Sequence, residues 1–413
     1  MAVKTLYVCY FGIQQALVQT QVLPYLRELR KEAVEVSFLT FEPEPAAEAF
    51  AQIKKDLATE GIDWSWLRYH KRPSSIATAW DIFRGAIFIR SFISRERPEI
   101  LHGRVHVPTL MAALARKFSS HKPKLLFDIR GFFPEEYTDA GIWPEGGWLY
   151  RSAKRVERWL LKESDAFIVL TEKAREILFP ESKETGIDRQ GRPVEVIPCC
   201  VDLTRFRVES ASTREELRER IGAGHRPVVV YVGSFGGWYL TDQMIDFFRT
   251  ARERDPRVFV LILTQRDADK VGERLRDRGF SSTDFYVASV PPHDVPKYLA
   301  AADLAISFIK ACYSKLSSSP TKIAEYLAAG LPIVANSGVG DIDALIRDND
   351  VGFILEDFDR ESYLEALPLI DSLSPELADR CRRLAEREFE LTAVGGARYN
   401  QIYRRLLEKR IEQ

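Results

Sequence analysis

The sequence has no surplus of charge of either sign. Its 413 residues contain 59 Lys and Arg against 60 Asp and Glu, which gives a formal net charge of −1. A protein that binds nucleic acid through its phosphates usually carries a basic field. The balance therefore disfavours nucleic acid as a partner, although local basic patches remain open.

Cysteine is scarce and long apolar runs are missing. The five cysteines are odd in number, and the only close pair, Cys199 and Cys200, is adjacent in sequence. Neither zinc-ligand spacing nor a disulfide framework is present, so we expect no metal site. No apolar run approaches membrane-spanning length, and the one near the start is too short for a secretory signal. We therefore expect a cytoplasmic protein.

Glycine and proline, at 23 and 21 residues, are too few for a long disordered tract. The length exceeds that of one typical core and predicts two or three domains. Short β-branched or aromatic runs alternate with helical segments, which is typical of parallel sheets with crossover helices. The expected strands are residues 5–10, 34–40, 100–102, 125–129, 166–170, 194–197, 228–232, 258–263, 285–288, 304–308, 333–335 and 353–355, and the first expected helix is 15–31. Two Rossmann-like halves should meet within residues 202–227.

The segment SSSPTKIAEYLAAGLPIV, residues 317–334, carries the clearest functional signal. Ser319 is a good N-cap, Pro320 suits the first helical position, and Gly330 suits the helix end. Free N–H groups at this helix start, with nearby hydroxyls, would form a nest for a phosphate. The hydroxyls are those of Ser317, Ser318, Ser319 and Thr321.

Lys322 lies in the first turn of this expected helix, where its charge opposes the helix dipole unless an anion lies between them. Glu325 follows at i+3, within reach of the hydroxyls of a sugar attached to such a phosphate. Phosphate beside polyol indicates a sugar nucleotide. The alternative is an ordinary amphipathic helix whose Lys322 and Glu325 are solvated.

This segment resembles the donor-site signature of family 4 glycosyltransferases, in the subgroup with P-x-K-x-x-E-Y-x-A-x-G-x-P. The resemblance extends to VPKYLAAADLAISF and GVGDIDALIRDNDVGFIL in the second half, and to QVLPYLRELRK, FDIRGFFPEE and VIPCCVDLTRF in the first. It implies the GT-B fold, in which two Rossmann-like α/β domains face each other across a cleft. Residues 1–205 would bind the acceptor, 206–390 the sugar nucleotide, and 391–413 would form a helix that crosses back. It also implies retaining transfer without metal or cofactor.

Ligands in open parallel sheets bind beyond the carboxyl ends of the strands, so we searched those ends for the site. Gly12 would let the backbone approach a ligand, or would only form a turn. His102, which could also be structural, leads into Arg104. Asp128 is followed by Arg130, which stands where family members often have a histidine that contacts the sugar. Hydroxyls of the acceptor would be bound by residues from this edge, namely His102, Arg104, Asp128, Arg130 and Glu135.

The second half departs from the family pattern at the donor site. Gly233 opens a glycine-rich loop, but Ser234 and Tyr239 stand where many members carry an arginine and a lysine for the diphosphate. Lys322 is the leading substitute. Arg266 is the next, and it could equally be a solvated loop residue. Ser317 stands where the family has the first of two glutamates, so Glu325 alone remains.

Two segments combine basic and aromatic residues at helical spacing and could rest on an anionic membrane. One contains Trp148 and Trp159 with Arg151, Arg155, Arg158 and Lys162, and the other contains Phe83, Ile87, Phe88 and Phe92 with Arg84, Arg90 and Arg95. The alternative for both is a solvated face on a helix packed against the core.

We therefore predict a retaining glycosyltransferase that moves a sugar from a nucleotide diphosphate sugar to a hydroxyl of a cell-surface glycan or lipid-linked acceptor. Lys322, Glu325, Asp128 and Arg130 are the candidate catalytic residues. Two alternatives stay open at this point. One is a sugar-nucleotide 2-epimerase of the same fold, and the other is a noncatalytic sugar-nucleotide-binding subunit.

Overall fold

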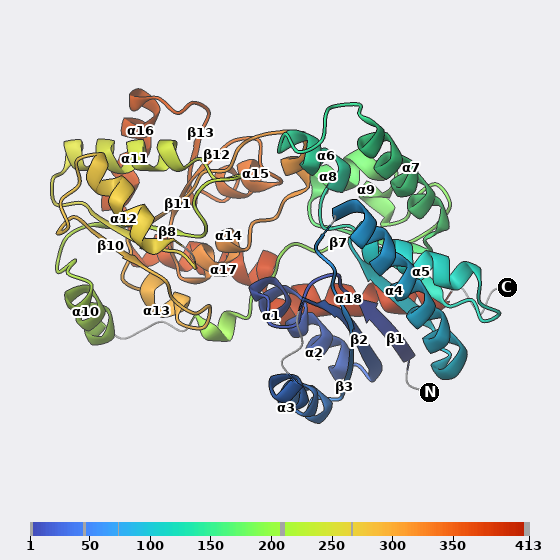
Figure 1. The fold of residues 1–413 in the computed structure, drawn as a ribbon. Coiled ribbons are helices and arrows are strands. Elements are labelled where there is room, and N and C mark those ends of the chain that lie inside the picture. The colour runs from blue at the N-terminus through green and yellow to red at the C-terminus, as the bar shows by residue number, and fades with distance from the viewer. Residues whose placement is uncertain (1–2, 44–46, 73, 207–210, 266, 409–413) are drawn as a thin grey trace. The chain divides into compact units, whose positions relative to one another are not determined.

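The computed structural model describes residues 3–43, 47–72, 74–206, 211–265 and 267–408. The chain forms two compact units. Unit 1 comprises Met1–Pro198 and Leu391–Gln413, and unit 2 comprises Cys199–Glu390. Each is a parallel sheet with helices on its faces, as the alternating pattern predicts (Figure 1).

In unit 1 the strands pair in parallel in the order β3-β2-β1-β4-β5-β6-β7. Their bounds are β1 Val3–Val8, β2 Val34–Glu42, β3 Ile62–Arg68, β4 Ile100–Arg104, β5 Lys124–Asp128, β6 Ala166–Val169 and β7 Val194–Val196. The helices are α1 Ala16–Gln21, α2 Leu23–Lys31, α3 Ala47–Thr59, α4 Ser74–Glu96, α5 His106–Lys117, α6 Phe133–Asp139, α7 Trp148–Glu163, α8 Glu172–Leu178, α9 Ser182–Thr185 and α18 Ala397–Glu408. The central strands are mostly buried, which is why their sequences are largely apolar.

Two local predictions for unit 1 were wrong. Strand β3 was not expected, because as an edge strand it alternates exposed and buried residues and lacks the apolar run of a central strand. The single helix expected over 15–31 is two helices, α1 and α2, that meet at Val22. Pro24 lies in the first turn of α2, and proline has no N–H to continue the ladder of α1.

In unit 2 the strands pair in parallel in the order β10-β9-β8-β11-β12-β13. Their bounds are β8 Val228–Val232, β9 Phe259–Leu263, β10 Phe285–Ala288, β11 Leu304–Ser307, β12 Ile333–Asn336 and β13 Gly352–Leu355. The α-helices are α10 Ala211–Arg220, α11 Thr241–Arg254, α12 Ala268–Asp277, α13 Val295–Leu299, α14 Thr321–Ala328, α15 Ile342–Arg347, α16 Arg360–Ala366 and α17 Pro375–Phe389. The short helices η1 Leu203–Arg205, η2 Tyr313–Ser317 and η3 Leu367–Asp371 lie in the connections.

The division between the units lies at Pro198 and Cys199, earlier than the expected 205 and 206. The N–H of Cys199 donates to the Ser319 hydroxyl at 3.1 Å, and the N–H of Val201 donates to the Phe389 carbonyl at 2.9 Å. Phe206 is buried in the core of unit 2. These contacts make the segment after Pro198 part of unit 2.

The chain ends within unit 1. A π-helical segment, η4 (Leu391–Gly396), leads directly into α18, which packs against α2 and β7. Two tyrosines of α18, Tyr399 and Tyr403, are buried in unit 1. Of residues 391–413, which the family resemblance predicts to form this returning helix, 409–413 lie outside the described residues.

Candidate functional site

Lys322, from the first turn of α14, lies over the carboxyl end of β8. Its Nζ donates to the Tyr231 hydroxyl at 3.1 Å and lies 4.2 Å from the ring centroids of both Tyr231 and Tyr239. A Cβ at Gly233 would come within 2.6 Å of this Nζ, and Gly233 has a φ of +143°. The residue at position 233 is therefore a glycine because the ammonium of Lys322 lies where any larger residue would have its Cβ.

The pKa values of both charged side chains in the first half of α14, Lys322 and Glu325, are shifted towards 7. Lys322 is 7% exposed, and burial lowers the pKa of its ammonium to about 7, against the opposing effect of Glu325. Burial raises the pKa of the partly buried Glu325 to about 7, although Arg205 and Lys322 oppose this. Within the described residues neither side chain forms an ion pair closer than 4 Å. A buried ammonium and a partly buried carboxylate without ion-pair partners are unfavourable in the free protein and typical of a functional site.

The hydroxyls around this helix start are arranged differently from the prediction. The N-cap of α14 is Pro320, not Ser319, and it makes no side-chain cap. The hydroxyl of Ser319 accepts a hydrogen bond from the N–H of Cys199, and the buried Ser317 hydroxyl donates to the Ser314 carbonyl at 2.7 Å. Ser318 and Thr321 are partly buried beside Lys322. The helix end is as predicted, since Gly330 has a φ of +79° and closes a Schellman motif.

The loop after β8 supplies aromatic rings to lysines from other elements. Tyr239 faces Lys322, and the Trp238 ring centroid lies 4.0 Å from the Nζ of Lys315, a buried residue of η2. The sequence prediction missed Lys315, although its place in KLSSSPTK, seven residues before Lys322, was a usable signal. Ser234 is exposed, and its carbonyl accepts from the Tyr231 hydroxyl. Arg266 lies outside the described residues.

Gly12, in unit 1, has a neighbour that explains it without a ligand. A Cβ there would lie 2.6 Å from Oε2 of Glu42. The other oxygen of this carboxylate accepts from the Ile13 N–H at 2.8 Å and from the Thr40 hydroxyl at 2.5 Å. The glycine therefore makes room for a buried carboxylate that caps the turn after β1.

The side chains predicted to bind the acceptor form a buried cluster centred on Asp128. Arg130 Nε lies 2.8 Å from Asp128 Oδ1, and the Tyr399 hydroxyl donates to Asp128 Oδ2 at 2.9 Å. His102 Nε2 lies 3.4 Å from the same Oδ2, and its Nδ1 lies 3.0 Å from the Tyr403 hydroxyl. His102 and Asp128 have no exposed surface. The cluster therefore holds α18 to unit 1, and the contact of His102 and Asp128 with an acceptor stays a prediction that their burial does not favour.

The electrostatics of this cluster agree with a structural role. Burial alone would raise the pKa of Asp128, but Arg130, His102 and Arg104 together hold it well below its usual range. Burial lowers the pKa of His102, so its imidazole is neutral at pH 7. Arg104 is 4% exposed and lies 3.7 Å from Asp128, while the Arg130 side chain is 6% exposed. Both arginines are thus engaged with Asp128 in the free protein, and their binding of an acceptor stays a prediction.

Glu135 belongs to a second buried cluster, between α5, α6 and α7. Lys154 Nζ lies 3.0 Å from its carboxylate, and the Tyr150 hydroxyl donates to it at 3.1 Å. Lys154 also pairs with Glu157, which accepts a 3.0 Å contact from His106. Glu135 thus joins two helices and is 8% exposed, and its role with an acceptor stays a prediction.

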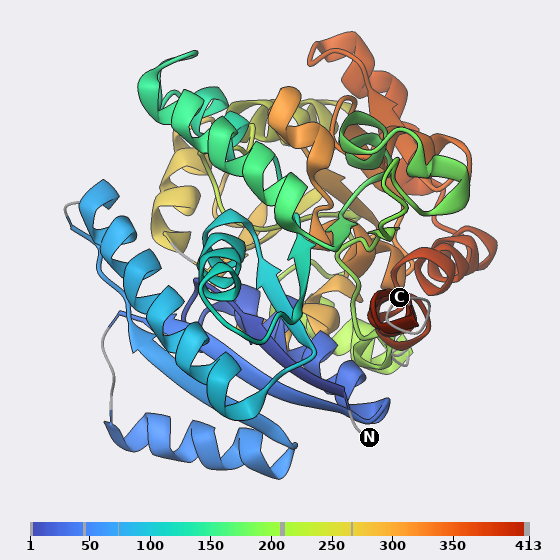
Figure 2. The ribbon, with the colours of Figure 1, turned by 90° about the vertical axis from the view of Figure 1, so that its right-hand side faces the viewer.

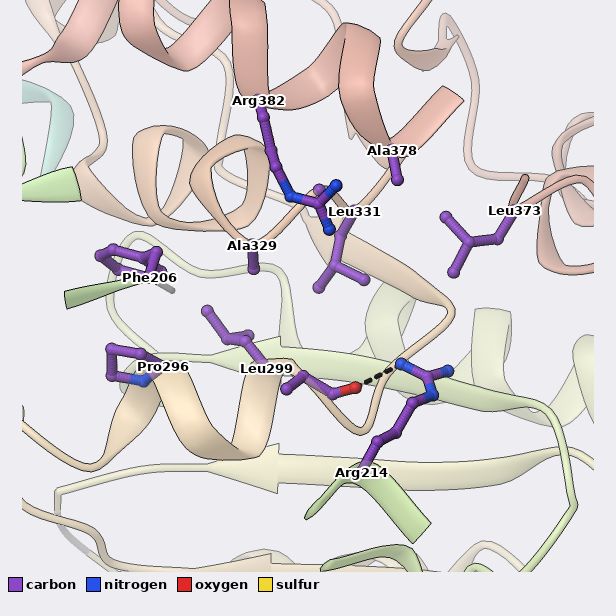
Figure 3. A pocket seen from close by; sticks show the side chains of 11 residues that line it. Phe206, Arg214, Pro296, Leu299, Ala329, Leu331, Leu373, Ala378 and Arg382 are labelled. Atoms are coloured by element: carbon purple, nitrogen blue, oxygen red, sulfur yellow. Dashed lines mark hydrogen bonds between the residues drawn. The ribbon is translucent and has the colours of Figure 1, made fainter. Parts of the chain in front are cut away.

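A small cavity of about 150 Å³ lies at the other end of α14, away from Lys322 (Figure 3). Leu299, Leu331 and Leu373 line it, with the guanidinium of Arg382 above Ala329. Arg214 donates to the carbonyls of Ala300 and Ala302 and pairs with Asp303, so its charge is used within unit 2. This cavity is separate from the candidate donor site.

Neither a membrane-spanning helix nor a metal-binding cluster is found in the described part of the chain. No helix there combines the length and the apolarity needed to span a bilayer. His, Cys, Asp and Glu side chains there form no group of three or more that could hold a metal ion.

Comparison with known protein families gives matches over most of the chain. Residues 18–200 match a glycosyl transferase 4-like domain, and residues 213–388 match glycosyl transferases group 1. The alpha-D-kanosaminyltransferase of Streptomyces kanamyceticus is 26% identical over 315 residues, which cover 72% of this chain and 71% of that protein.

Solved structures resemble the whole chain. A glycosyltransferase from Rickettsia africae aligns over 98% of this chain and 99% of its own, with a TM-score of 0.71 and 16% identity. Anabaena HepE in complex with UDP-glucose aligns over 99% and 100%, with a TM-score of 0.65 and 14% identity. At these identities the likeness shows the fold alone, and it confirms the predicted α/β class with two Rossmann-like units.

Proposed function

Because the chain is a glycosyltransferase with the GT-B fold, we propose that it transfers a sugar from a nucleotide diphosphate sugar to a hydroxyl of a cell-surface glycan or lipid-linked acceptor. The transfer would retain the anomeric configuration and need neither metal nor cofactor. The protein would work in the cytoplasm, at the inner face of the membrane when its acceptor is lipid-linked.

The observation that carries this proposal is the pair of unsatisfied charges at the start of α14. Lys322 is buried without a carboxylate partner. One turn later, burial raises the pKa of the Glu325 carboxyl to about 7. A diphosphate beside Lys322 would supply the missing negative charge, and sugar or ribose hydroxyls would donate to Glu325. Anabaena HepE, which shares the fold, is described in complex with UDP-glucose, which supports a sugar nucleotide as donor.

The chemistry needs charge stabilisation where the leaving group departs. As the bond from the anomeric carbon to the diphosphate oxygen breaks, negative charge grows on that oxygen. The Lys322 ammonium and the free N–H groups of the first turn of α14 would stabilise it, and a preorganised site does so without reorganisation at the moment of reaction. Glu325 would hold the donor hydroxyls while the acceptor oxygen forms its bond on the same face and its proton passes to the departing diphosphate oxygen.

A binding screen with UDP, GDP, TDP and ADP sugars tests the proposal. We expect one base to bind well above the others, and nucleotide diphosphate to be released when a pool of membrane glycolipids is added as acceptor. Epimerised sugar from donor alone would show a 2-epimerase instead. Donor binding without turnover on any acceptor would show a noncatalytic subunit, and no binding of any donor would refute a sugar-nucleotide site.

A further inference from the structure

Helix α4 carries a row of large apolar side chains on its outer face. Ile76, Trp80, Phe83 and Ile87 are 70%, 50%, 56% and 54% exposed. Their spacings of four, three and four residues place them along one stripe of a helix. The Trp80 and Phe83 rings lie 5.8 Å apart, between centroids, so the stripe is continuous. We call these four residues the α4 ridge.

The α4 ridge is distinct from the packed face of the same helix. Ala77, Gly85, Ile89 and Phe92 point inward and are buried, with Gly85 directly against Met111 of α5. Phe92, expected from sequence to belong to the exposed set, is 7% exposed. Figure 2 shows α4 as the light-blue helix along the outer side of unit 1. The ridge is therefore an apolar surface beyond what the fold needs.

Basic side chains border this ridge. At about 100° per residue, Arg84 and Arg90 lie on opposite flanks of the stripe, and both are exposed. Exposed Lys71, Arg72 and Arg95 lie near the two ends of the helix. Asp81, the sole acidic residue from 71 to 95, is buried and contacts His70 at 2.5 Å and the Tyr10 hydroxyl at 2.7 Å. The exposed charges beside and before the ridge are therefore positive, with the exposed Glu96 nine residues beyond Ile87 at the end of α4, although the whole chain has a net charge of −1.

We propose that the α4 ridge and its flanking arginines are a docking surface for an anionic lipid bilayer. Trp and Phe suit the boundary between headgroups and acyl chains, and arginines beside them pair with lipid phosphates. The ridge runs from Ile76 to Ile87, a rise of roughly 16 Å along the helix axis, so the helix can lie flat on the surface. This inference goes beyond the proposed reaction, because it assigns the place where unit 1 works.

The charge pattern argues against a second copy of the chain as the occupant. In a two-fold symmetric contact, each ridge would face the same ridge, and Arg84 and Arg90 of both copies would be brought together. Like charges at such a contact repel, whereas phosphate headgroups would neutralise them. An anionic bilayer therefore satisfies both the apolar and the charged part of the surface.

Flotation of the full-length protein with lipid vesicles tests the proposal. We expect binding to vesicles of 70% phosphatidylcholine and 30% phosphatidylglycerol, and at least tenfold weaker binding to pure phosphatidylcholine. The double variants Trp80→Ser/Phe83→Ser and Arg84→Glu/Arg90→Glu should each weaken binding to anionic vesicles at least tenfold. The matched control is Trp148→Ser, which removes the 73% exposed tryptophan of α7 and should leave binding unchanged.

Tryptophan quenching by brominated lipids locates the contact. The parent protein should be quenched by anionic brominated vesicles, and Trp80→Phe, which keeps the ridge apolar, should bind equally but be quenched less. Failure of the parent protein to bind anionic vesicles at low salt would overturn the proposal, as would binding that is lost in Trp148→Ser and kept in the ridge variants. Sedimentation velocity that showed a dimer abolished by Trp80→Ser/Phe83→Ser would instead assign the ridge to a second copy.

Discussion

The Lys322→Met variant keeps the length and the apolar stem of the side chain but removes its ammonium. In the free protein this group has a pKa lowered by burial from 10.5 to about 7. Each pKa unit between unfolded and folded protein corresponds to about 1.4 kcal/mol, so the lysine destabilises the free protein by up to about 4 kcal/mol at neutral pH. Methionine also loses the hydrogen bond to Tyr231 and the contacts with two rings, which offset about 1–3 kcal/mol of that gain.

We therefore expect Lys322→Met to be more stable than the parent protein without ligand. One kcal/mol raises the Tm of a domain of this size by about 2–4 °C, so the expected rise is a few degrees. Folding lowers the pKa of Lys322, so the folded protein binds fewer protons than the unfolded chain between about pH 7 and 10.5. Parent stability consequently rises with pH across that window, and the advantage of the variant should shrink there.

Binding should change in the opposite direction. Loss of one charge-assisted hydrogen bond to phosphate corresponds to about 1.5–3 kcal/mol, roughly ten- to a hundredfold in affinity. Calorimetric titration with the best-bound nucleotide diphosphate should show this loss, while the matching nucleoside binds both proteins equally. Lys322→Ala should show the same loss of diphosphate affinity. Equal diphosphate affinities, or a methionine variant less stable than the parent with unchanged binding, would remove Lys322 from the donor site.

Three further outcomes follow from the same geometry. Glu325→Gln should leave the Tm of the free protein equal or slightly higher, yet it should lower turnover at least tenfold. A loss of rate that only follows a loss of stability would show that Glu325 has a structural role. Diphosphate affinity should fall at least about tenfold from pH 6 to pH 8, because Lys322 loses its proton and Glu325 gains its negative charge near pH 7, and Lys322→Met should lose the lysine part of this dependence in parallel titrations. Gly233→Ala should lower both Tm and diphosphate affinity, because its Cβ would lie 2.6 Å from Lys322 Nζ and 3.0 Å from the Tyr231 hydroxyl; an unchanged crystal structure and affinity would contradict the close packing.

The parts of the fold that were predictable are those encoded locally. Continuous apolar runs mark parallel strands, so the central strand β8 and the apolar edge strand β10 were placed by sequence with the bounds that the structure shows. The edge strand β3 was missed because half of its residues face solvent. The end of α14 was predicted because Gly330 is the residue that its left-handed conformation requires.

The candidate site was predictable only in part, because its partners come from distant segments. Lys322 and Glu325 were found from their spacing, but the rings of Tyr231 and Tyr239 that surround the ammonium could not be inferred from α14 itself. In unit 1 the reverse happened. Asp128 lies at a strand end, where ligand-binding residues are expected, but its Oδ2 accepts a hydrogen bond from the hydroxyl of Tyr399, 271 residues later. The spacing of residues in the sequence does not predict a contact between segments so far apart.

The return of the C-terminal segment to unit 1 has a consequence for synthesis on the ribosome. Asp128 and His102 obtain the Tyr399 and Tyr403 hydroxyls only after residues 199–390 have been made. At about 5–20 residues per second, that interval is roughly 10–40 s. Unit 2 is continuous in sequence and can finish folding first, whereas unit 1 has to wait with its polar cluster uncovered. Chaperone dependence of the nascent chain should therefore reside in the N-terminal half.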